Sequence, residues 1–196
     1  MEKRLMRAGN MEYPLPAVMV SCGQTPEDFN IITVAWTGTV CSDPALCYIS
    51  VRKERHSYNL IKQYGEFVLN LTTEQLAKAT DWCGVRSGRD FNKFAEMHLT
   101  PVKATHVKAP LVGESPVNIE CRVKEIVPLG THDMFIAEVL AVHVDEALID
   151  PETNALLLEK AHLIAYSHGH YYALGRELGH FGFSVRKKSK AKRPRK

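Results

Sequence analysis

Cationic side chains gather where a predicted strand passes into a predicted helix. The three cations are Arg52, Lys53 and Arg55. They follow the β-prone run 46–51, and a helix is predicted to begin near Ser57. The unpaired backbone N–H groups and the macrodipole of a helix N-terminus favour an anion, and neighbouring cations strengthen that preference. These residues therefore predict a phosphate site, with a solvated basic turn as the alternative because such clusters are common on surfaces.

The run before these cations has small side chains where a ligand could approach the backbone. Residues 31–36 alternate as in a β-strand. Small residues occur in and just after this run, at Thr33, Ala35, Thr37 and Gly38. A turn, a second strand, a helix and a third strand are predicted to follow in that order. This arrangement is suited to a planar ligand that carries a phosphate.

Further strands are predicted on both sides of this stretch. Residues 17–22 and 67–71 are β-prone. Residues 117–124 and 135–144 are predicted as long strands, the first by its period-two alternation, with residues 130–133 as the hairpin loop between them. Several strands at short spacing, with helices inserted, favour one barrel with helical excursions.

The helices and the last strand have weaker signals. One helix is predicted to end at Gly65, and another to begin at Thr72, where Gln75 completes a capping-box pattern. Residues 150–154 are polar and predict a loop, and residues 161–166 predict a final strand.

The central stretch resembles the FMN-binding split β-barrel of the flavin reductase-like proteins, and in particular the flavoredoxin branch. The matching motifs are N-x-x-T-x-A-W-x-G from Asn30, S-D-P from Ser42, S-V-R with R-x-S from Ser50, and G-E-F-V-x-N from Gly65. Later matches extend the resemblance over roughly residues 13–184. It implies a mainly β (α+β) fold, a Greek-key-like antiparallel barrel with inserted helices.

The resemblance also implies which residues contact the flavin. Backbone groups of residues 33–37 would contact the polar edge of the flavin ring. Lys93 would contact the phosphate together with Arg52 and Arg55. A C-G, S-G-R-D and K-F series from Cys83 would lie over the flavin. The expected cofactor-binding residues are Thr33, Val34, Ala35, Trp36, Thr37, Ser50, Val51, Arg52, Arg55, Ser57, Asn70, Cys83, Lys93, Phe94, His132 and Tyr171.

Three of these residues have a competing structural interpretation. Phe94 could pack in the core beside a short helix, and His132 could be an exposed loop residue without a role. Arg52 could pair with an acid such as Glu54 or Glu66 and steady the turn. No acid–base catalyst is assigned, because hydride transfer to a flavin needs none from the side chains.

The cysteine and histidine patterns predict neither disulfides nor metal. The five cysteines show no C-x-x-C spacing, which argues against a disulfide framework and a structural zinc site. Cys83 could be a redox thiol, but no resolving cysteine lies at close spacing. No acid or cysteine cluster accompanies His168 and His170, so no bound metal is expected.

Length and charge predict one domain with appendages. We expect a polar lead-in over residues 1–12, a flavin reductase-like FMN-binding domain over 13–185, and a basic disordered tail over 186–196. That tail holds eight of the 25 Lys and Arg residues, which leaves 17 against 22 acids and a net charge of −5 for the remainder. We therefore expect that any weak contact with a polyanion is made by the basic tail.

The first residues carry no long apolar run, so neither a secretory signal nor a membrane span is expected and the cytoplasm is the predicted compartment. The resemblance implies an FMN-dependent oxidoreductase that moves electrons or hydride through the bound flavin, with NAD(P)H as a transient donor. No G-x-G-x-x-G follows a predicted strand, so a Rossmann nicotinamide domain is not expected.

Two other functions remain open at this point. The protein could be a non-catalytic FMN electron carrier that serves a protein donor. It could also bind nucleic acid through its basic tail, although the acidic body offers no basic groove. The split barrels of this family pair with their cofactor sites near the subunit interface, so a homodimer with a small-molecule or protein redox partner is expected.

Overall fold

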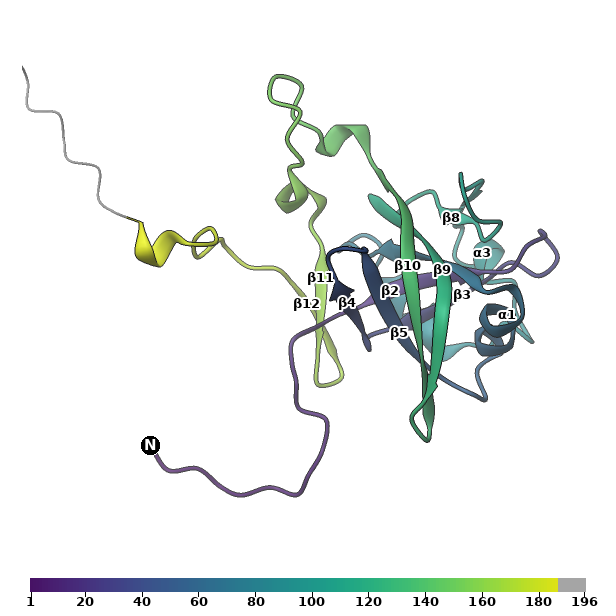
Figure 1. Cartoon of the computed structure of the whole chain (residues 1–196), viewed down its shortest axis with the longest axis horizontal. Helices are drawn as coiled ribbons and strands as arrows, with labels where there is room; N and C mark the ends of the chain where they lie inside the picture. Colours follow the sequence, from purple (N-terminus) through teal and green to yellow (C-terminus); the bar gives the residue numbers. More distant parts are fainter. Residues whose placement is uncertain (187–196) are drawn as a thin grey trace, which may run out of the picture.

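Seven antiparallel strands form the main sheet of the computed structural model, which describes residues 1–186. In spatial order these strands are β3 (Asn30–Val34), β2 (Val18–Cys22), β6 (Glu66–Leu71), β9 (Val117–Pro128), β10 (His132–Val144), β5 (Leu46–Arg52) and β4 (Thr37–Cys41). Figure 1 shows the long β9–β10 hairpin, which forms the middle of this sheet.

The sheet curls until its two edge strands approach one another. β3 and β4 lie at opposite edges, yet only Ala35 and Trp36 separate them in the chain. The backbone N–H of Ser50 in β5 donates to the carbonyl oxygen of Trp36 at 2.9 Å, which holds this crossing in place. Among the described residues no ladder of backbone hydrogen bonds joins β3 to β5. The chain connection through Ala35 and Trp36 closes the barrel at this point, and the sheet itself stays open between β3 and β5.

Alternation along the strands builds two cores. Val18, Val20 and Cys22 of β2 point into the barrel with Ile49 and Phe135. Met19, on the opposite face of β2, and Ile31 of β3 pack under the helices. Because successive strand residues face opposite sides, one strand contributes to both cores. The mainly β barrel with inserted helices that the sequence predicted is confirmed.

Helix α1 (His56–Tyr64) packs against the barrel, with Tyr58 and Ile61 in its core. The helix ends at Gly65 in the left-handed conformation, with φ of 69°, as the sequence predicted. Asp133 of β10 accepts a hydrogen bond from the Tyr58 hydroxyl at 2.7 Å and lies 3.2 Å from the Lys53 ammonium. These contacts fix the helix N-terminus relative to the β9–β10 hairpin.

Helices α2 (Ala77–Val85) and α3 (Lys93–Glu96) pack on the outer face of β2 and β3. The predicted capping box at Thr72 is wrong. The Thr72 hydroxyl instead donates to the carbonyl oxygen of Ala17, and the next residue forms a β-bridge, so the helix starts five residues later. The local capping signal was overridden by strand pairing at this position.

Smaller elements complete the chain. β7 (Pro101–Val102) pairs with β8 (Leu111–Val112), and β1 (Leu15–Pro16), β11 (Ile164–Ser167) and β12 (His170–Ala173) form a separate three-stranded sheet. Short 3-10 turns are η1 (Glu146–Leu148), η2 (Leu158–Ala161) and η3 (Phe183–Val185).

Several predicted boundaries shift. The strand predicted over 31–36 ends at Val34, and the last predicted strand begins three residues late because η2 occupies its start. The hairpin loop predicted over 130–133 is shorter, since His132 already belongs to β10.

The chain before Tyr13 is exposed throughout and runs away from the barrel (Figure 1). Of the predicted basic tail, only Arg186 lies in the described part of the chain, and residues 187–196 lie outside it. None of the helices in residues 1–186 is long and apolar enough to cross a bilayer.

Candidate functional site

A cavity of about 390 Å³ opens where the split edge of the barrel faces the small sheet and α2. Backbone and side chains of β3, the β3–β4 crossing and β5 form its floor, and the apolar residues there offer contact surface to a planar ligand. The lining residues are Tyr13, Ala17, Ile32, Thr33, Val34, Ala35, Trp36, Ser50, Val51, Arg52, Arg55, Asp81, Gly84, Val85, His132, Tyr166 and Tyr171.

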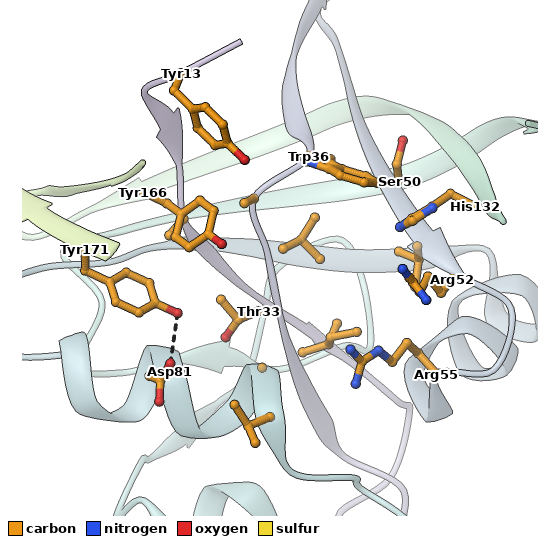
Figure 2. A pocket seen from close by; sticks show the side chains of 17 residues that line it. Tyr13, Thr33, Trp36, Ser50, Arg52, Arg55, Asp81, His132, Tyr166 and Tyr171 are labelled. Atoms are coloured by element: carbon orange, nitrogen blue, oxygen red, sulfur yellow. Dashed lines mark hydrogen bonds between the residues drawn. The ribbon is translucent and has the colours of Figure 1, made fainter. Parts of the chain in front are cut away.

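One end of this cavity is cationic. Figure 2 shows Arg52, Arg55 and His132 on the same side, with the Trp36 ring beside the His132 ring at a centroid distance of 4.4 Å. Burial, followed by the charge of Arg52, lowers the pKa of His132, so its imidazole is neutral near pH 7. The two guanidinium groups therefore carry the positive charge of this end.

The structure places Arg52 beside an acid and also in the wall of the cavity. Its guanidinium lies 3.4 Å from the Glu54 carboxylate, and the two side chains are 51% and 65% exposed. An ion pair this exposed contributes little to the stability of the fold, so a stronger anion can readily replace Glu54 as the partner of Arg52. Arg52 also lines the cavity, so the pairing with Glu54 leaves it available to a phosphate.

A second cavity, of about 240 Å³, adjoins the first at the N-terminus of α1. The two cavities share Ile32, Arg55 and Gly84 in their walls, which makes them neighbouring compartments of one site. The second is lined by Asn30, Ile32, Glu54, Arg55, His56, Ser57, Cys83, Gly84, Arg86, Ser87, Gly88, Arg89 and Lys93.

The helix start in the second cavity is open to an anion. Arg55 precedes α1 in an extended conformation and no side chain caps the first turn. The Ser57 hydroxyl accepts a hydrogen bond from Asn30 at 2.7 Å, which fixes its position in the wall of this cavity. With His56 and Ser57 both lining this cavity, the uncapped N–H groups of the first turn lie beside it.

Lys93 is a buried cation in the same wall. Its ammonium donates to the carbonyl oxygen of Cys83 at 2.7 Å, and burial lowers its pKa to about 8. An anion in the cavity would favour the charged form and relieve part of that desolvation. Burial also raises the pKa of the Cys83 thiol to about 11, which makes it unsuited to a reactive thiolate.

The other end of the first cavity is aromatic and acidic. Tyr13, Tyr166 and Tyr171 come from the small sheet and the segment that leads into it. Neighbouring rings in this row have centroids 6.2 Å and 5.6 Å apart. The Tyr171 hydroxyl donates to the Asp81 carboxylate of α2 at 3.3 Å. This end can stack a planar group and accept a hydrogen bond from it.

The structure brings most of the predicted site residues together. Ten of them line the first cavity, with Arg55 shared by both cavities, and three more line the second cavity only. The residues of the first cavity are Thr33, Val34, Ala35, Trp36, Ser50, Val51, Arg52, Arg55, His132 and Tyr171. Those confined to the second are Ser57, Cys83 and Lys93.

Three predicted residues, Thr37, Asn70 and Phe94, line neither cavity. The Thr37 hydroxyl donates to the carbonyl oxygen of Tyr48 at 2.7 Å. Asn70 is fully buried, where it ties neighbouring strands together through several hydrogen bonds. Phe94 packs in the core under α2 and α3. All three side chains support the fold around the site.

Sequence reasoning missed Tyr13 and Asp81. Tyr13 lies in the lead-in to β1 and reaches the cavity only because β1 pairs with β11. Asp81 lies in the middle of α2, and its helical position gave no motif of its own. The one available signal was that Asp81 is the single acid in the helix segment that precedes Cys83-Gly84.

The residues present fit a flavin mononucleotide. Such a ligand needs apolar walls for its ring, polar backbone groups at one ring edge and a cationic pocket for its phosphate. The first cavity supplies the walls and the backbone of the crossing, and the second supplies Arg55, Lys93 and the open helix start. A Cβ at Gly84, between the two, would lie 3.2 Å from the Thr33 Cβ, so only glycine avoids crowding this passage.

Comparisons with known proteins agree with this geometry. A flavoredoxin of Desulfovibrio vulgaris (Miyazaki F) is 30% identical in sequence, with a TM-score of 0.87 over 94% of this chain and 100% of that chain. An uncharacterized protein of Archaeoglobus fulgidus is 34% identical over 144 residues, which are 72% of this chain and 80% of that protein.

A third relative has a named activity. The NADH-dependent FMN reductase of Streptomyces nodosus subsp. asukaensis is 30% identical over 141 residues, covering 70% of this chain and 73% of the reductase. The sequence pattern of the flavin reductase-like domain matches residues 10–175. That match contains both cavities and nearly every element described above, and so the chain belongs to the flavin reductase-like domain family.

Proposed function

We propose that this protein binds FMN and acts as an oxidoreductase that passes electrons or hydride from NAD(P)H through the bound flavin. The observation that carries the proposal is the pair of adjoining cavities, one suited to a planar ring and the other to a phosphate. Membership of the flavin reductase-like family supports a redox function through flavin. The NADH-dependent FMN reductase among its relatives supports both the cofactor and the donor.

The cofactor would supply two-electron chemistry, and the protein would supply position and charge. Backbone groups of the β3–β4 crossing, at Val34 to Trp36, would hydrogen-bond to the polar edge of the ring. Arg52, Arg55 and Lys93 would neutralise the phosphate together with the N–H groups at the start of α1.

The site would prefer FMN to other flavins because the cationic pocket for the phosphate is separate from the cavity for the flavin ring. Riboflavin could place its ring in the first cavity but would leave the cations of the second without a partner. The second cavity, at about 240 Å³, would be filled largely by a phosphate and its ribityl chain, which favours FMN over FAD.

A second candidate function is an electron carrier with tightly held FMN and a protein donor. The similarity to a flavoredoxin at 30% identity over nearly the whole chain favours it. The two functions share the cofactor site and differ in whether a nicotinamide can reach the ring.

Anaerobic reduction of the FMN-loaded protein separates these functions. We expect the visible flavin absorbance to be lost within seconds to minutes after addition of NADH or NADPH. Reduction by neither nucleotide, with rapid reduction by a low-potential protein donor, would establish the carrier and contradict the oxidoreductase. Failure of the colourless protein to take up FMN would contradict both.

A further inference from the structure

The two ends of the first cavity differ in charge, and the proposed FMN site uses only one of them. Figure 2 shows Arg52 and Arg55 on one side and Asp81 with Tyr171 on the other. The phosphate belongs with the cations and the second cavity. The acidic and aromatic end is therefore left for a different ligand, although it opens into the same space.

That end offers a row of aromatic side chains. Tyr13, Tyr166 and Tyr171 are half-buried, and the Tyr166–Tyr171 pair meets edge to face with centroids 5.6 Å apart. Their hydroxyl-bearing rings all border the cavity. Tyrosines held in this way present apolar contact surface at little entropic cost, which suits the stacking of a planar ring.

Asp81 adds a carboxylate to the same end. The Tyr171 hydroxyl donates to its Oδ1 at 3.3 Å, and within residues 1–186 its Oδ2 takes part in no hydrogen bond. Burial, together with the charge of Asp81, raises the pKa of Tyr171 to about 12, so the hydroxyl keeps its proton and stays a donor to Asp81. The free oxygen can then accept a hydrogen bond from a ligand in the cavity.

We propose that this end seats the second redox substrate, and that Asp81 selects planar rings that bear a hydrogen-bond donor and no negative charge. The inference rests on the proposed function, because the substrate would lie against the bound flavin. A carboxylate repels an anionic ring and accepts a hydrogen bond from an amide or amine. Asp81 thereby becomes a specificity-determining residue for the electron donor or acceptor.

For a dihydropyridine donor, Asp81 would also favour the transfer itself. The C–H bond opposite the ring nitrogen would break, and the hydride with both electrons would pass to the flavin, which would be reduced. The donor loses those electrons and leaves as a pyridinium cation. A carboxylate fixed beside that ring stabilises the positive charge as it develops, so its effect is larger in the transition state than in the bound donor.

The test uses two synthetic donors that differ only at this contact. N-benzyl dihydronicotinamide carries a neutral carboxamide, and N-benzyl dihydronicotinic acid carries a carboxylate in its place. Neither has a phosphate, so the two donors differ in charge only at the carboxamide position. Anaerobic stopped-flow reduction of the FMN-loaded protein gives a second-order rate constant for each donor. The ratio of the two, divided by the same ratio with free FMN in solution, measures the preference that the protein imposes.

We expect the wild-type protein to favour the carboxamide at least tenfold by this measure. In Asp81→Asn the preference should fall roughly tenfold or more, because a charge-assisted hydrogen bond and a repulsion are both lost. Glu74→Gln is the matched control, since it removes one exposed carboxylate just before α2 and outside both cavities. It should keep the wild-type ratio. FMN affinity and thermal stability are measured on each variant.

An unchanged ratio in Asp81→Asn, with FMN bound and the fold intact, would overturn the role of Asp81 and leave the proposed function standing. Tyr171→Phe keeps the carboxylate and the ring, so it should retain at least part of the preference. Loss of the preference in Tyr171→Phe alone would assign selectivity to the hydroxyl and also contradict the inference. A wild-type protein that binds no FMN would overturn the proposed function and this inference together.

Discussion

At the scale of single residues, Arg52 separates phosphate recognition from ring recognition. Arg52→Ala should weaken FMN binding roughly ten- to a hundredfold, because a charge-assisted hydrogen bond typically contributes about 1.5–3 kcal/mol. Riboflavin has the same ring and no phosphate, so its affinity should hardly change. Fluorescence titration of the apoprotein with both ligands measures the two dissociation constants.

The exposed pair between Arg52 and Glu54 has a matched counterpart far from the site. Lys124 on β9 lies 3.3 Å from Glu138 in a similarly exposed pair, and it lines neither cavity. Lys124→Ala removes the same charge and the same kind of contact, so both affinities should stay unchanged. Equal losses of FMN and riboflavin affinity in Arg52→Ala would mean that Arg52 supports the fold and does not hold the phosphate.

Lys93 should make FMN binding depend on pH. Burial lowers its pKa to about 8 in the free protein, and a bound phosphate would raise that pKa. Affinity for FMN is therefore strongest below the free value and falls as the pH rises through it and the ammonium loses its proton. Titrations between about pH 7 and about pH 10 should show this loss for FMN and a flat profile for riboflavin.

Lys93→Met keeps the length of the side chain and removes its charge. The variant should bind FMN more weakly at neutral pH and lose the decline above about pH 8. Because methionine avoids the cost of burying an ammonium, the fold should hold. A variant that retains the wild-type pH profile would show that another group titrates.

At the scale of elements, one buried carboxylate holds a long loop against the barrel. Glu120 of β9 is fully buried and accepts hydrogen bonds from the backbone N–H groups of Thr105, His106 and Val107 at 2.5–2.9 Å. His143 of β10 also contacts it. Burial alone would raise the pKa of Glu120, but these hydrogen bonds outweigh it and hold the pKa at about 2.

Glu120→Gln should lower the free energy of unfolding by about 2 kcal/mol, because a neutral amide cannot accept this set of hydrogen bonds. The carboxylate stabilises the fold fully above its unfolded pKa of about 4.5, and that stability is lost as the pH falls toward about 2. Urea unfolding at several pH values measures both effects. Glu125→Gln, on an exposed position of the same strand, should leave stability within error, and an equal loss there would contradict the assignment.

Sequence patterns predicted β9 by its alternation of apolar and polar residues, although the polar Asn118 and Glu120 of its first half are also buried. β2 is buried along both faces because it serves two cores. β4 escaped prediction, since its residues Thr37–Cys41 are small and half-exposed and form a strand only by pairing with β5. Its pairing depends on closure of the barrel, which no local pattern encodes.

The residues of the candidate site also divide into those that the sequence could predict and those that it could not. Arg52, Arg55 and Ser57 are close in sequence around a strand-to-helix junction, so it could be predicted from spacing that they lie near one another. Tyr13 and Asp81 reach the cavity from segments far apart in the chain, through the small sheet and α2. Only the tertiary structure brings them together, and no short motif marks either one.

At the scale of the whole molecule, we expect a homodimer in solution. The edge strand β4 exposes Val40 at 50%, and a third cavity of about 560 Å³ lies between Trp36, Tyr48 and the exposed lead-in. An edge strand and apolar surface of this kind are commonly covered by a second subunit. Light scattering coupled to size exclusion should give twice the mass of one chain at micromolar concentration.

Val40→Glu should shift that mass toward the monomer, because it places a charge on the exposed edge. Val102→Glu serves as the control, since Val102 is 41% exposed on β7, away from the edge strand. A monomeric wild-type protein with FMN bound would contradict the dimer. A dimer that withstands Val40→Glu would place the interface elsewhere on the surface.

The identity of the bound flavin tests the central claim most directly. The purified protein, or the apoprotein after incubation with a mixture of FMN and FAD, is heated, and the released flavin is identified by chromatography. The two joined cavities, one for a ring and a smaller one for a phosphate, predict that FMN is recovered in near-stoichiometric amount and FAD only in traces. Recovery of mainly FAD, or a protein that retains no flavin, would contradict the account.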